Sequence, residues 1–367
     1  MADTSVSYKC LNCGGPLTFE PGKTTVTCEY CGTEFEVAAL EKMYAKQEEL
    51  AAKAQEAKEA KWKTDEAGSE WSIDEANMMK AFTCSSCGAE IVCDENTMAT
   101  ECVYCGNPTM LPNRFDGMLK PDLIIPFKKT KEEAVAALKK FYEGKKLLPD
   151  AFTANNRIED IQGMYVPFWL FDSTAGGRAT YKTTTSLVYD DGDEVVTETS
   201  HFQCVRAGDA EFEMIPVDGS TKMDDQFMES IEPFDYSELV PFTTAYMTSY
   251  LADKYDVDAE ASVPRANARI DNSIRAELEK TVAGQYETWS EESCDCYENE
   301  GKVSYAMVPV WILTTQFEGK PYTFMMNGQT GKFVGQLPID KAKLQKYQMM
   351  AFGIAAAIMA VILYFVL

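Results

Sequence analysis

The longest apolar run of the chain covers residues 349–367, and these 19 residues contain no charged side chain. A helix of that length spans roughly 28 Å at 1.5 Å per residue, close to the bilayer's hydrocarbon thickness of about 30 Å. A buried core helix is the alternative. Such a helix normally keeps a polar face, whereas the only polar side chain here is that of Tyr364. The pattern therefore predicts one transmembrane helix over residues 349–367.

The orientation follows from the charges beside this run. Lys341, Lys343 and Lys346 lie just before it, and basic residues collect on the cytoplasmic side of a membrane. We therefore expect a single-pass protein of the cell membrane with a C-terminal anchor and a cytoplasmic N-terminal part. No basic segment followed by an apolar one opens the sequence, so no signal peptide is expected. Gly353 and Ala357 form a small-xxx-small pair that could let two anchors pack into a homo-oligomer.

Residues 120–338 alternate apolar and polar stretches in a way that predicts a globular α+β body. Two strands share a Val-Pro-x-Trp core, at 165–170 and 307–312, and each follows a helical segment, at 131–142 and 261–282. Openings of the form apolar-Pro-Phe occur at Ile125 and Val240, ahead of the two helices. These similarities predict a duplicated helix-plus-sheet unit. Chance likeness between two buried strands is the alternative.

Turns are expected after each of these strands, at 175–177 and at 317–319, where glycines allow a positive φ. Residues 327–332, Asn-Gly-Gln-Thr-Gly-Lys, predict a tight turn rather than a phosphate loop, because the spacing GxxxxGK[ST] is absent. The acidic run at 190–194 lacks the length and terminal Glu of a calcium-binding loop, so we expect a solvated hairpin tip there.

Eight of the 12 cysteines form four CxxC pairs, each followed by Gly, and 14 residues separate the two pairs of each set. A CxxC turn directs two thiolates at one metal, and two such turns joined by short strands form a zinc ribbon. Eight unrelated reduced cysteines are the alternative. The spacing predicts two zinc ribbons, at 8–37 and 81–112, with strands at 90–93 and 98–101 in the second. Each would hold one structural Zn²⁺, through Cys10, Cys13, Cys28 and Cys31 and through Cys84, Cys87, Cys102 and Cys105.

Between the ribbons, residues 38–80 are rich in Ala, Glu and Lys up to about residue 63, which predicts a solvated spacer helix or, alternatively, a short coiled coil. Residues 64–77 are expected to be a flexible acidic connection.

The balance of acidic and basic residues disfavours nucleic-acid binding. Lys and Arg number 34 against 58 acidic residues, for a net charge of -24. Such a chain repels phosphate backbones, and residues 82–112 of the second ribbon contain no Lys or Arg. The ribbons therefore resemble protein-binding or spacing modules rather than nucleic-acid readers.

No catalytic constellation is evident. His201 is the only histidine, which excludes paired-His metal sites. Cys93, Cys204, Cys294 and Cys296 lie outside the ribbons. Cys294 and Cys296 could bind a metal or form a disulfide, but the role of Cys204, Cys294 and Cys296 is left open. We therefore expect that the protein is not an enzyme and that it binds no cofactor besides zinc.

The CxxCG pairs, the Tyr-Val-Pro-Phe-Trp-Leu-Phe-Asp strand at 165–172, the Ile-Glu-Pro-Phe-Asp-Tyr-Ser-Glu-Leu segment at 231–239, the turn at 327–332 and the terminal apolar run together resemble the TFIIB-type zinc-ribbon-containing membrane proteins of Gram-positive bacteria. The resemblance covers nearly the whole chain. It implies protein partners of the phage-shock or flotillin-like type at the membrane. Many similar proteins have one ribbon, whereas two are predicted here.

The hypothesis that these patterns favour is a membrane-anchored cytosolic adaptor or scaffold that uses its ribbons for protein–protein interaction, in envelope-stress or membrane-organising assemblies. One alternative is a zinc-ribbon protein that binds nucleic acid or the transcription machinery. The other is an enzyme with its site in the duplicated body.

Overall fold

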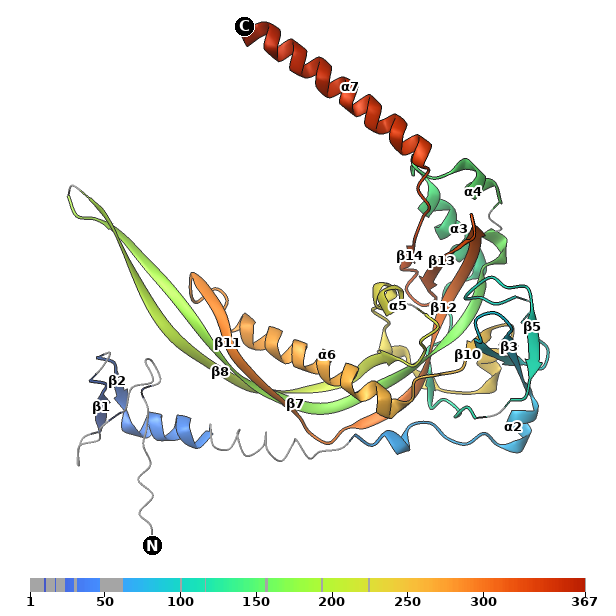
Figure 1. Ribbon diagram of the computed structural model, residues 1–367. Helices are drawn as coiled ribbons and strands as arrows, with labels where there is room; N and C mark the ends of the chain where they lie inside the picture. Colours follow the sequence, from blue (N-terminus) through green and yellow to red (C-terminus); the bar gives the residue numbers. More distant parts are fainter. Residues whose placement is uncertain are drawn as a thin grey trace. The chain divides into compact units, whose positions relative to one another are not determined.

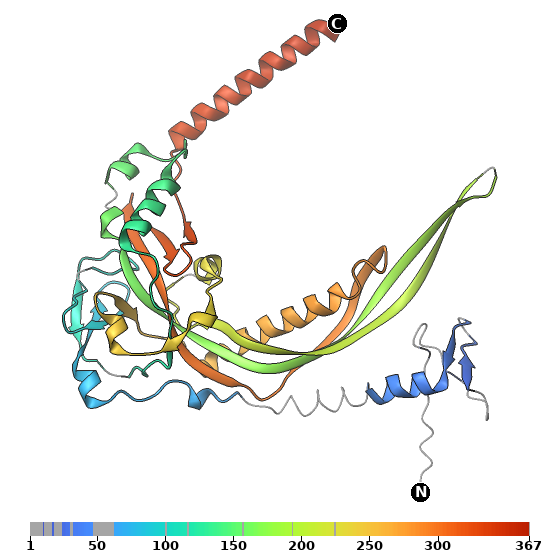
Figure 2. The ribbon, with the colours of Figure 1, turned by 180° about the vertical axis from the view of Figure 1, so that it is seen from behind.

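The computed structural model describes residues 10, 17, 24–29, 32–46, 62–99, 101–115, 117–155, 158–192, 194–223 and 225–366. The chain divides into two compact units. Unit 1 comprises Met1–Glu66, Leu170–Val217 and Glu260–Val303, and unit 2 comprises Ala67–Trp169, Asp218–Ala259 and Ser304–Leu367. The body is mostly β (Figure 1, Figure 2).

Unit 2 is built on a sheet in which hydrogen-bonded neighbours come from distant parts of the sequence. Its strand order is β14 (Phe333–Gly335), β13 (Lys320–Asn327), β12 (Lys302–Phe317), β7 (Gln162–Asp190), β10 (Leu251–Asp253), β4 (Glu90–Asp94), β3 (Met79–Cys84) and β5 (Met110–Asn113). Residues 162–169 of β7 belong to this unit.

The two Val-Pro-x-Trp strands are neighbours in this sheet, and each accepts a short parallel strand. β6 (Leu123–Ile124) pairs with β12, and β10 pairs with β7. β6 also pairs antiparallel with β9 (Val240–Pro241), so the two apolar-Pro-Phe openings meet each other. The tryptophans of both motifs, Trp169 and Trp311, are buried.

The predicted helix at 131–142 is confirmed as α3 (Lys131–Tyr142). It begins with a capping box in which Thr130 and Glu133 bond each other's backbone N–H groups. Ala134 and Leu138 are fully buried at a spacing of four residues, which places them on one helix face. That face packs against Phe324 and other aromatic side chains of unit 2.

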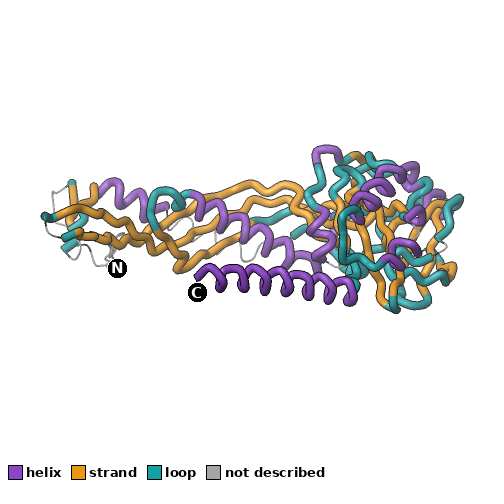
Figure 3. The backbone as a smooth tube through the Cα atoms, turned by 90° about the horizontal axis from the view of Figure 1, so that it is seen from above, coloured by secondary structure: helices purple, strands orange, loops and turns teal. Residues whose placement is uncertain are grey.

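Unit 1 contains a second sheet region and one long helix. Here β8 (Val195–Asp218) and β11 (Thr288–Glu298) both pair with residues of β7 after Trp169. Helix α6 (Ala259–Lys280) runs along these strands (Figure 3). Ile270, Ile274 and Leu278 of α6 are buried against Ala179 and other β7 residues, which accounts for their four-residue spacing.

The turn predicted at 175–177 is wrong, because β7 continues through these residues as one strand of 29 residues. Its glycines provide close approach instead. A Cβ on Gly177 would lie 2.6 Å from Cγ2 of Ile274, and one on Gly176 would lie 2.5 Å from the hydroxyl of Tyr297. Glycine in a strand interior therefore marks here the place where α6 and neighbouring side chains approach the backbone.

The other predicted turns are confirmed. β7 and β8 join at 190–194, where the Asp191 N–H donates to the Glu194 carbonyl, and β12 and β13 join at Glu318 and Gly319. The Gly331 N–H donates to the Asn327 carbonyl in the turn between β13 and β14. Glu318, Gly319 and Gly331 all have positive φ.

Residues 64–77 are ordered rather than a simple flexible connection. They contain a 3₁₀ turn, η1 (Thr64–Glu66), and α2 (Ile73–Asn77), which a Ser72–Glu75 capping box begins. Of the predicted spacer helix, residues 37–46 are helical, and residues 47–61 lie outside the described part. The remaining elements are β1 (Thr25–Thr27), β2 (Glu34–Glu36), α4 (Asp150–Asn155), η2 (Ile158–Asp160), α5 (Asp225–Ile231), η3 (Tyr236–Glu238) and η4 (Thr244–Met247).

The chain's last described element is α7 (Lys341–Val366). Its stretch Lys341–Tyr364 is long and apolar enough to cross a membrane, and none of its apolar window is buried. A helix over the predicted apolar run is therefore confirmed as far as Val366.

Because the Gly177 Cα faces Ile274 so closely, we expect Gly177→Ala to destabilise the detergent-solubilised chain by about 1–3 kcal/mol, the usual cost of overpacking. Gly208→Ala is the matched control: it is also in a strand, with nothing within 4 Å of an added Cβ. Thermal unfolding followed by circular dichroism measures both variants. Equal melting temperatures for the two would contradict the close approach.

Candidate metal centre

The first half of the centre is a tight turn that follows β3. Cys84 ends the strand, its N–H donates to the Ala89 carbonyl at 2.9 Å, and the Gly88 N–H donates back to the Cys84 carbonyl at 3.0 Å. Gly88 has a φ of +70°, which a side chain would disfavour. The turn directs Cys84 and Cys87 to the same point.

The second half repeats this hydrogen-bond pattern. The Cys102 N–H donates to the Asn107 carbonyl at 2.9 Å, and the Gly106 N–H donates to the Cys102 carbonyl at 2.8 Å. Gly106 has a φ of +67°. The two CxxCG segments are therefore the same structural device used twice.

The four sulfur atoms meet. All lie within 4.8 Å of one another, and the Cys84–Cys105 and Cys87–Cys102 Sγ pairs are each 3.6 Å apart. For comparison, a tetrahedral site with metal–sulfur bonds of about 2.3 Å has edges of about 3.8 Å. Cys84 and Cys102 are 2% and 1% exposed, and the other two are half-buried. The cluster can hold a metal ion.

Electrostatics favour a cation at this point. Burial raises the pKa values of Cys87 and Cys102. Burial acts on Cys84 in the same direction, but the N–H groups of Cys87 and Ser86 bond its sulfur and lower its pKa to about 6. Four thiolates at this spacing repel one another, and a divalent ion offsets that repulsion while it displaces their protons.

The centre is bonded directly to the main sheet of unit 2. From β12, the Thr314 hydroxyl donates to the Val103 carbonyl at 2.6 Å, and the Gln316 amide donates to the Cys105 carbonyl at 2.8 Å. β4, which follows the first turn, pairs with β10. Residues 81–112 and much of the body thus belong to one compact unit.

Tyr104, between Cys102 and Cys105, is half-buried, and its hydroxyl lies 3.8 Å from the Met164 sulfur on β7. Beside it is Asp253, whose pKa burial raises to about 7. The Ser220 and Tyr104 hydroxyls lie near this carboxyl, but neither forms a hydrogen bond of good geometry with it.

The strands around the centre differ from those predicted. A strand at 90–93 is confirmed as β4, but residues 98, 99 and 101 are not in a strand. Instead β3 and β5, on either side of the cysteines, pair with each other. Thr314 and Gln316 were missed, because hydrogen bonds to residues about 211 positions away leave no local sequence signal.

Part of the first predicted ribbon is described. Cys10 and Cys28 are buried in one cluster with Leu17, Val26 and Leu40. The Cys28 N–H donates to the Thr33 carbonyl and the Gly32 N–H donates to the Cys28 carbonyl, both at 2.9 Å. Gly32 has a φ of +72°. This is the same turn as at Cys84 and Cys102. Cys13 and Cys31 lie outside the described residues.

The remaining cysteines are not part of this centre. Cys93 is buried in β4, and its thiol donates to the Thr97 carbonyl at 3.2 Å. The Cys294 and Cys296 sulfurs lie 3.6 Å apart on β11 in unit 1, and burial raises the pKa of both thiols. Cys204 is buried in β8. Within the described residues, only the Cys84 cluster gathers three or more metal-binding side chains closely.

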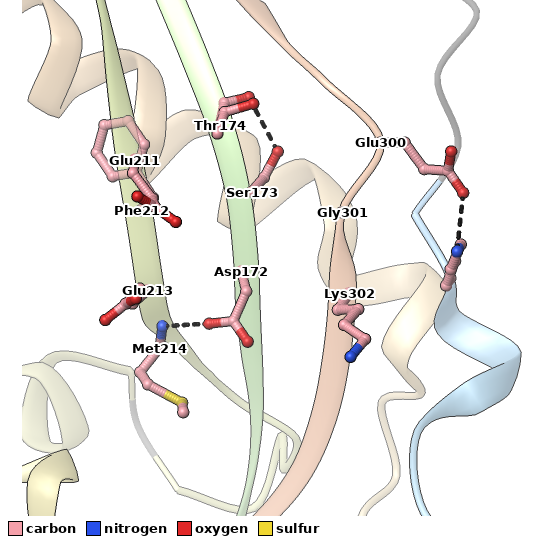
Figure 4. A pocket seen from close by; sticks show the side chains of 11 residues that line it. Asp172, Ser173, Thr174, Glu211, Phe212, Glu213, Met214, Glu300, Gly301 and Lys302 are labelled. Atoms are coloured by element: carbon pink, nitrogen blue, oxygen red, sulfur yellow. Dashed lines mark hydrogen bonds and ion pairs between the residues drawn. The ribbon is translucent and has the colours of Figure 1, made fainter.

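A hollow of about 580 Å³ in unit 1 carries several ionisable groups (Figure 4). Asp172 accepts the Met214 N–H at 2.6 Å, and Lys63 pairs with Glu300 at 3.2 Å. The Ser173 hydroxyl is directed at the backbone carbonyls of Thr174 and Asn299. These groups bond one another or the backbone, so they do not form a nucleophile and its general base.

The fold and site define a mostly β protein with a four-cysteine cluster able to hold a metal ion and a C-terminal helix apolar enough to cross a membrane. The chain belongs to the family of the uncharacterized protein YdjG of Bacillus subtilis (strain 168). The two are 34% identical over 339 residues, which are 92% of each chain. No known family model matches the chain, and no solved structure does.

If the Cys84 cluster holds a metal, Cys102→Ala removes one ligand of a closed site and should lower the bound metal by one ion per chain. The free energy of unfolding should fall by more than the roughly 1 kcal/mol expected for loss of a buried sulfur alone. Cys93→Ala is the matched control, because it removes a buried thiol that is not in the cluster. Metal analysis of the purified proteins decides, and unchanged metal content in Cys102→Ala would refute the site.

Proposed function

We propose that the protein is a membrane-anchored cytosolic adaptor with two structural zinc ribbons, the first of which binds a protein partner. The observation that carries the proposal is the closed cluster of Cys84, Cys87, Cys102 and Cys105, bonded into the same unit as α7. Four thiolate ligands leave no position on a tetrahedral ion for a substrate, so the metal would stabilise structure.

Zinc is the metal that this donor set favours, because four-cysteine tetrahedral sites in ribbons usually hold Zn²⁺. The turn at Cys28 has the hydrogen bonds of the two turns around Cys84 and Cys102. This likeness supports a second zinc ion, held by Cys10, Cys13, Cys28 and Cys31. Both ions together would account for the eight CxxC cysteines.

The two ribbons would have different roles. In the second, the backbone carbonyls of Val103 and Cys105 already accept hydrogen bonds from Thr314 and Gln316 of the body. The backbone of this second ribbon's CxxC turn is thus already bonded to the body. Partner binding would therefore fall to the first ribbon. The net charge of -24 disfavours nucleic acid as that partner.

The body would be a duplicated scaffold. β6 precedes α3 and β7, as β10 precedes α6 and β12, and each short strand pairs parallel with the long strand of the other set. This reciprocal pairing of equivalent strands supports an internal duplication. In this arrangement β10, rather than β9, is the counterpart of β6.

α7 would anchor this scaffold, with Lys341, Lys343 and Lys346 on the cytoplasmic side of the cell membrane. The resemblance to TFIIB-type zinc-ribbon membrane proteins extends the proposal to membrane-organising partners of the phage-shock or flotillin-like type.

The test is quantitative mass spectrometry of proteins that co-purify with the full chain from gently solubilised host membranes. We expect Cys28→Ser to lose a defined set of partners, because the first ribbon loses a ligand. Cys204→Ala, which removes a buried cysteine outside both ribbons, should retain that set. An identical set of partners for Cys28→Ser and the unaltered chain would overturn the proposal.

A further inference from the structure

Two groups of lysines that lie about 200 residues apart in the sequence meet where α7 begins. The Lys343 ammonium donates to the Leu148 carbonyl at 2.7 Å and pairs with Asp150 at 2.6 Å. The Asp340 N–H donates to the Leu147 carbonyl at 2.8 Å. These contacts fix the loop after α3 against the first turn of α7 (Figure 1).

The lysines concerned come from the end of α3, the loop after it and the start of α7. All but Lys343, which is half-buried, are exposed. We call them the lysine collar: Lys139, Lys140, Lys145, Lys146, Lys341, Lys343 and Lys346. Residues 139–150 contain four Lys against Glu143 and Asp150, and residues 340–346 contain three Lys against Asp340, which together give a net charge of +4 in a chain whose total is -24. Positive charge is thus concentrated at this place against the trend of the molecule.

The height of the collar above a membrane follows from α7. Lys343 lies six residues before Met349, where the uncharged run begins, and six residues of helix rise about 9 Å. The loop bonded to Lys343 would therefore lie about one Debye length, roughly 8–10 Å, from the hydrocarbon boundary. At that distance lysines interact with the headgroups of the leaflet.

The collar also borders a hollow of about 330 Å³. Lys145 and Lys146 lie on its rim, and Leu148, Leu337 and Ile339 contribute apolar lining. Ile339 is 60% exposed although it is large and apolar. A cationic rim next to an apolar hollow matches a molecule that has a phosphate beside a hydrocarbon chain.

We propose that the lysine collar and this hollow form a binding site for an anionic phospholipid of the cytoplasmic leaflet. The inference rests on α7 being a membrane anchor, as proposed above. Each lysine near a negative leaflet adds attraction, and clusters of four to eight beside a transmembrane helix bind anionic lipids. Bound lipid would hold unit 2 against the membrane surface.

Native mass spectrometry of the full chain in detergent tests the site, with phosphatidylglycerol and phosphatidylcholine offered at equal concentration. We expect phosphatidylglycerol to be retained in preference, on the order of tenfold. A variant with Lys139, Lys140, Lys145 and Lys146 all changed to Gln should lose most of this preference. The control changes four lysines of unit 1 to Gln, namely Lys63, Lys182, Lys280 and Lys302, and should keep it.

Alkaline extraction of membranes that contain the same proteins separates the two proposals. A chain that resists extraction yet retains both lipids equally is anchored without a lipid site, which overturns this inference alone. A chain that alkali releases has no membrane anchor, which overturns both. Equal loss of preference in the collar variant and the control would show a general charge effect and would also overturn the site.

Discussion

A buried thiolate needs an opposite charge nearby, and residues 84–105 bring four cysteine sulfurs within 4.8 Å of one another. Without a cation, ionised thiolates at this distance repel one another. The thiols can avoid this by staying protonated, but the N–H groups that bond the Cys84 sulfur favour its ionised form. A divalent ion resolves both difficulties. The strands β3 and β4 flank the first pair of ligands, and β4 pairs with β10 of the central sheet. The packing of β3 and β4 against the central sheet of unit 2 therefore depends on what neutralises the four sulfurs.

Hydrogen bonds join the cysteine cluster to the body of unit 2. Thr314 and Gln316 of β12 bond the carbonyls of the second CxxC turn, and the half-buried Tyr104 of that turn lies beside Asp253 of β10. Burial raises the pKa of the Asp253 carboxyl, so its ionisation above that pKa costs stability. From β12, the chain continues through β13 and β14 to α7. The cysteine cluster and the apolar helix α7 thus belong to the same unit, whereas nearly all of α6 and its strands form another.

Features with a strict local spacing were predictable from the sequence. The CxxCG pairs, the α3 helix with its capping box and the Asn327 turn depend on residues a few positions apart. The errors share a cause. Gly176 and Gly177 signal a turn locally, but in β7 they make room for Tyr297 and Ile274, which are about 100 positions away. The strand expected at 98–101 was replaced by the β3–β5 pairing, which sequence periodicity cannot reveal. Likewise, the loop after α3 shows no sign in the sequence that α7 begins beside it.

The most direct test of the central claim is X-ray absorption spectroscopy at the zinc edge, combined with metal analysis, on the full chain purified without added metal. The chain described here should carry zinc with four sulfur neighbours at about 2.3 Å and no nitrogen or oxygen ligand. Two ions per chain would mean that both ribbons are filled, and one would restrict the metal to a single cluster. A chain that contains no metal, or a metal bound mainly through nitrogen and oxygen, would contradict the claim that the four cysteines form a metal centre.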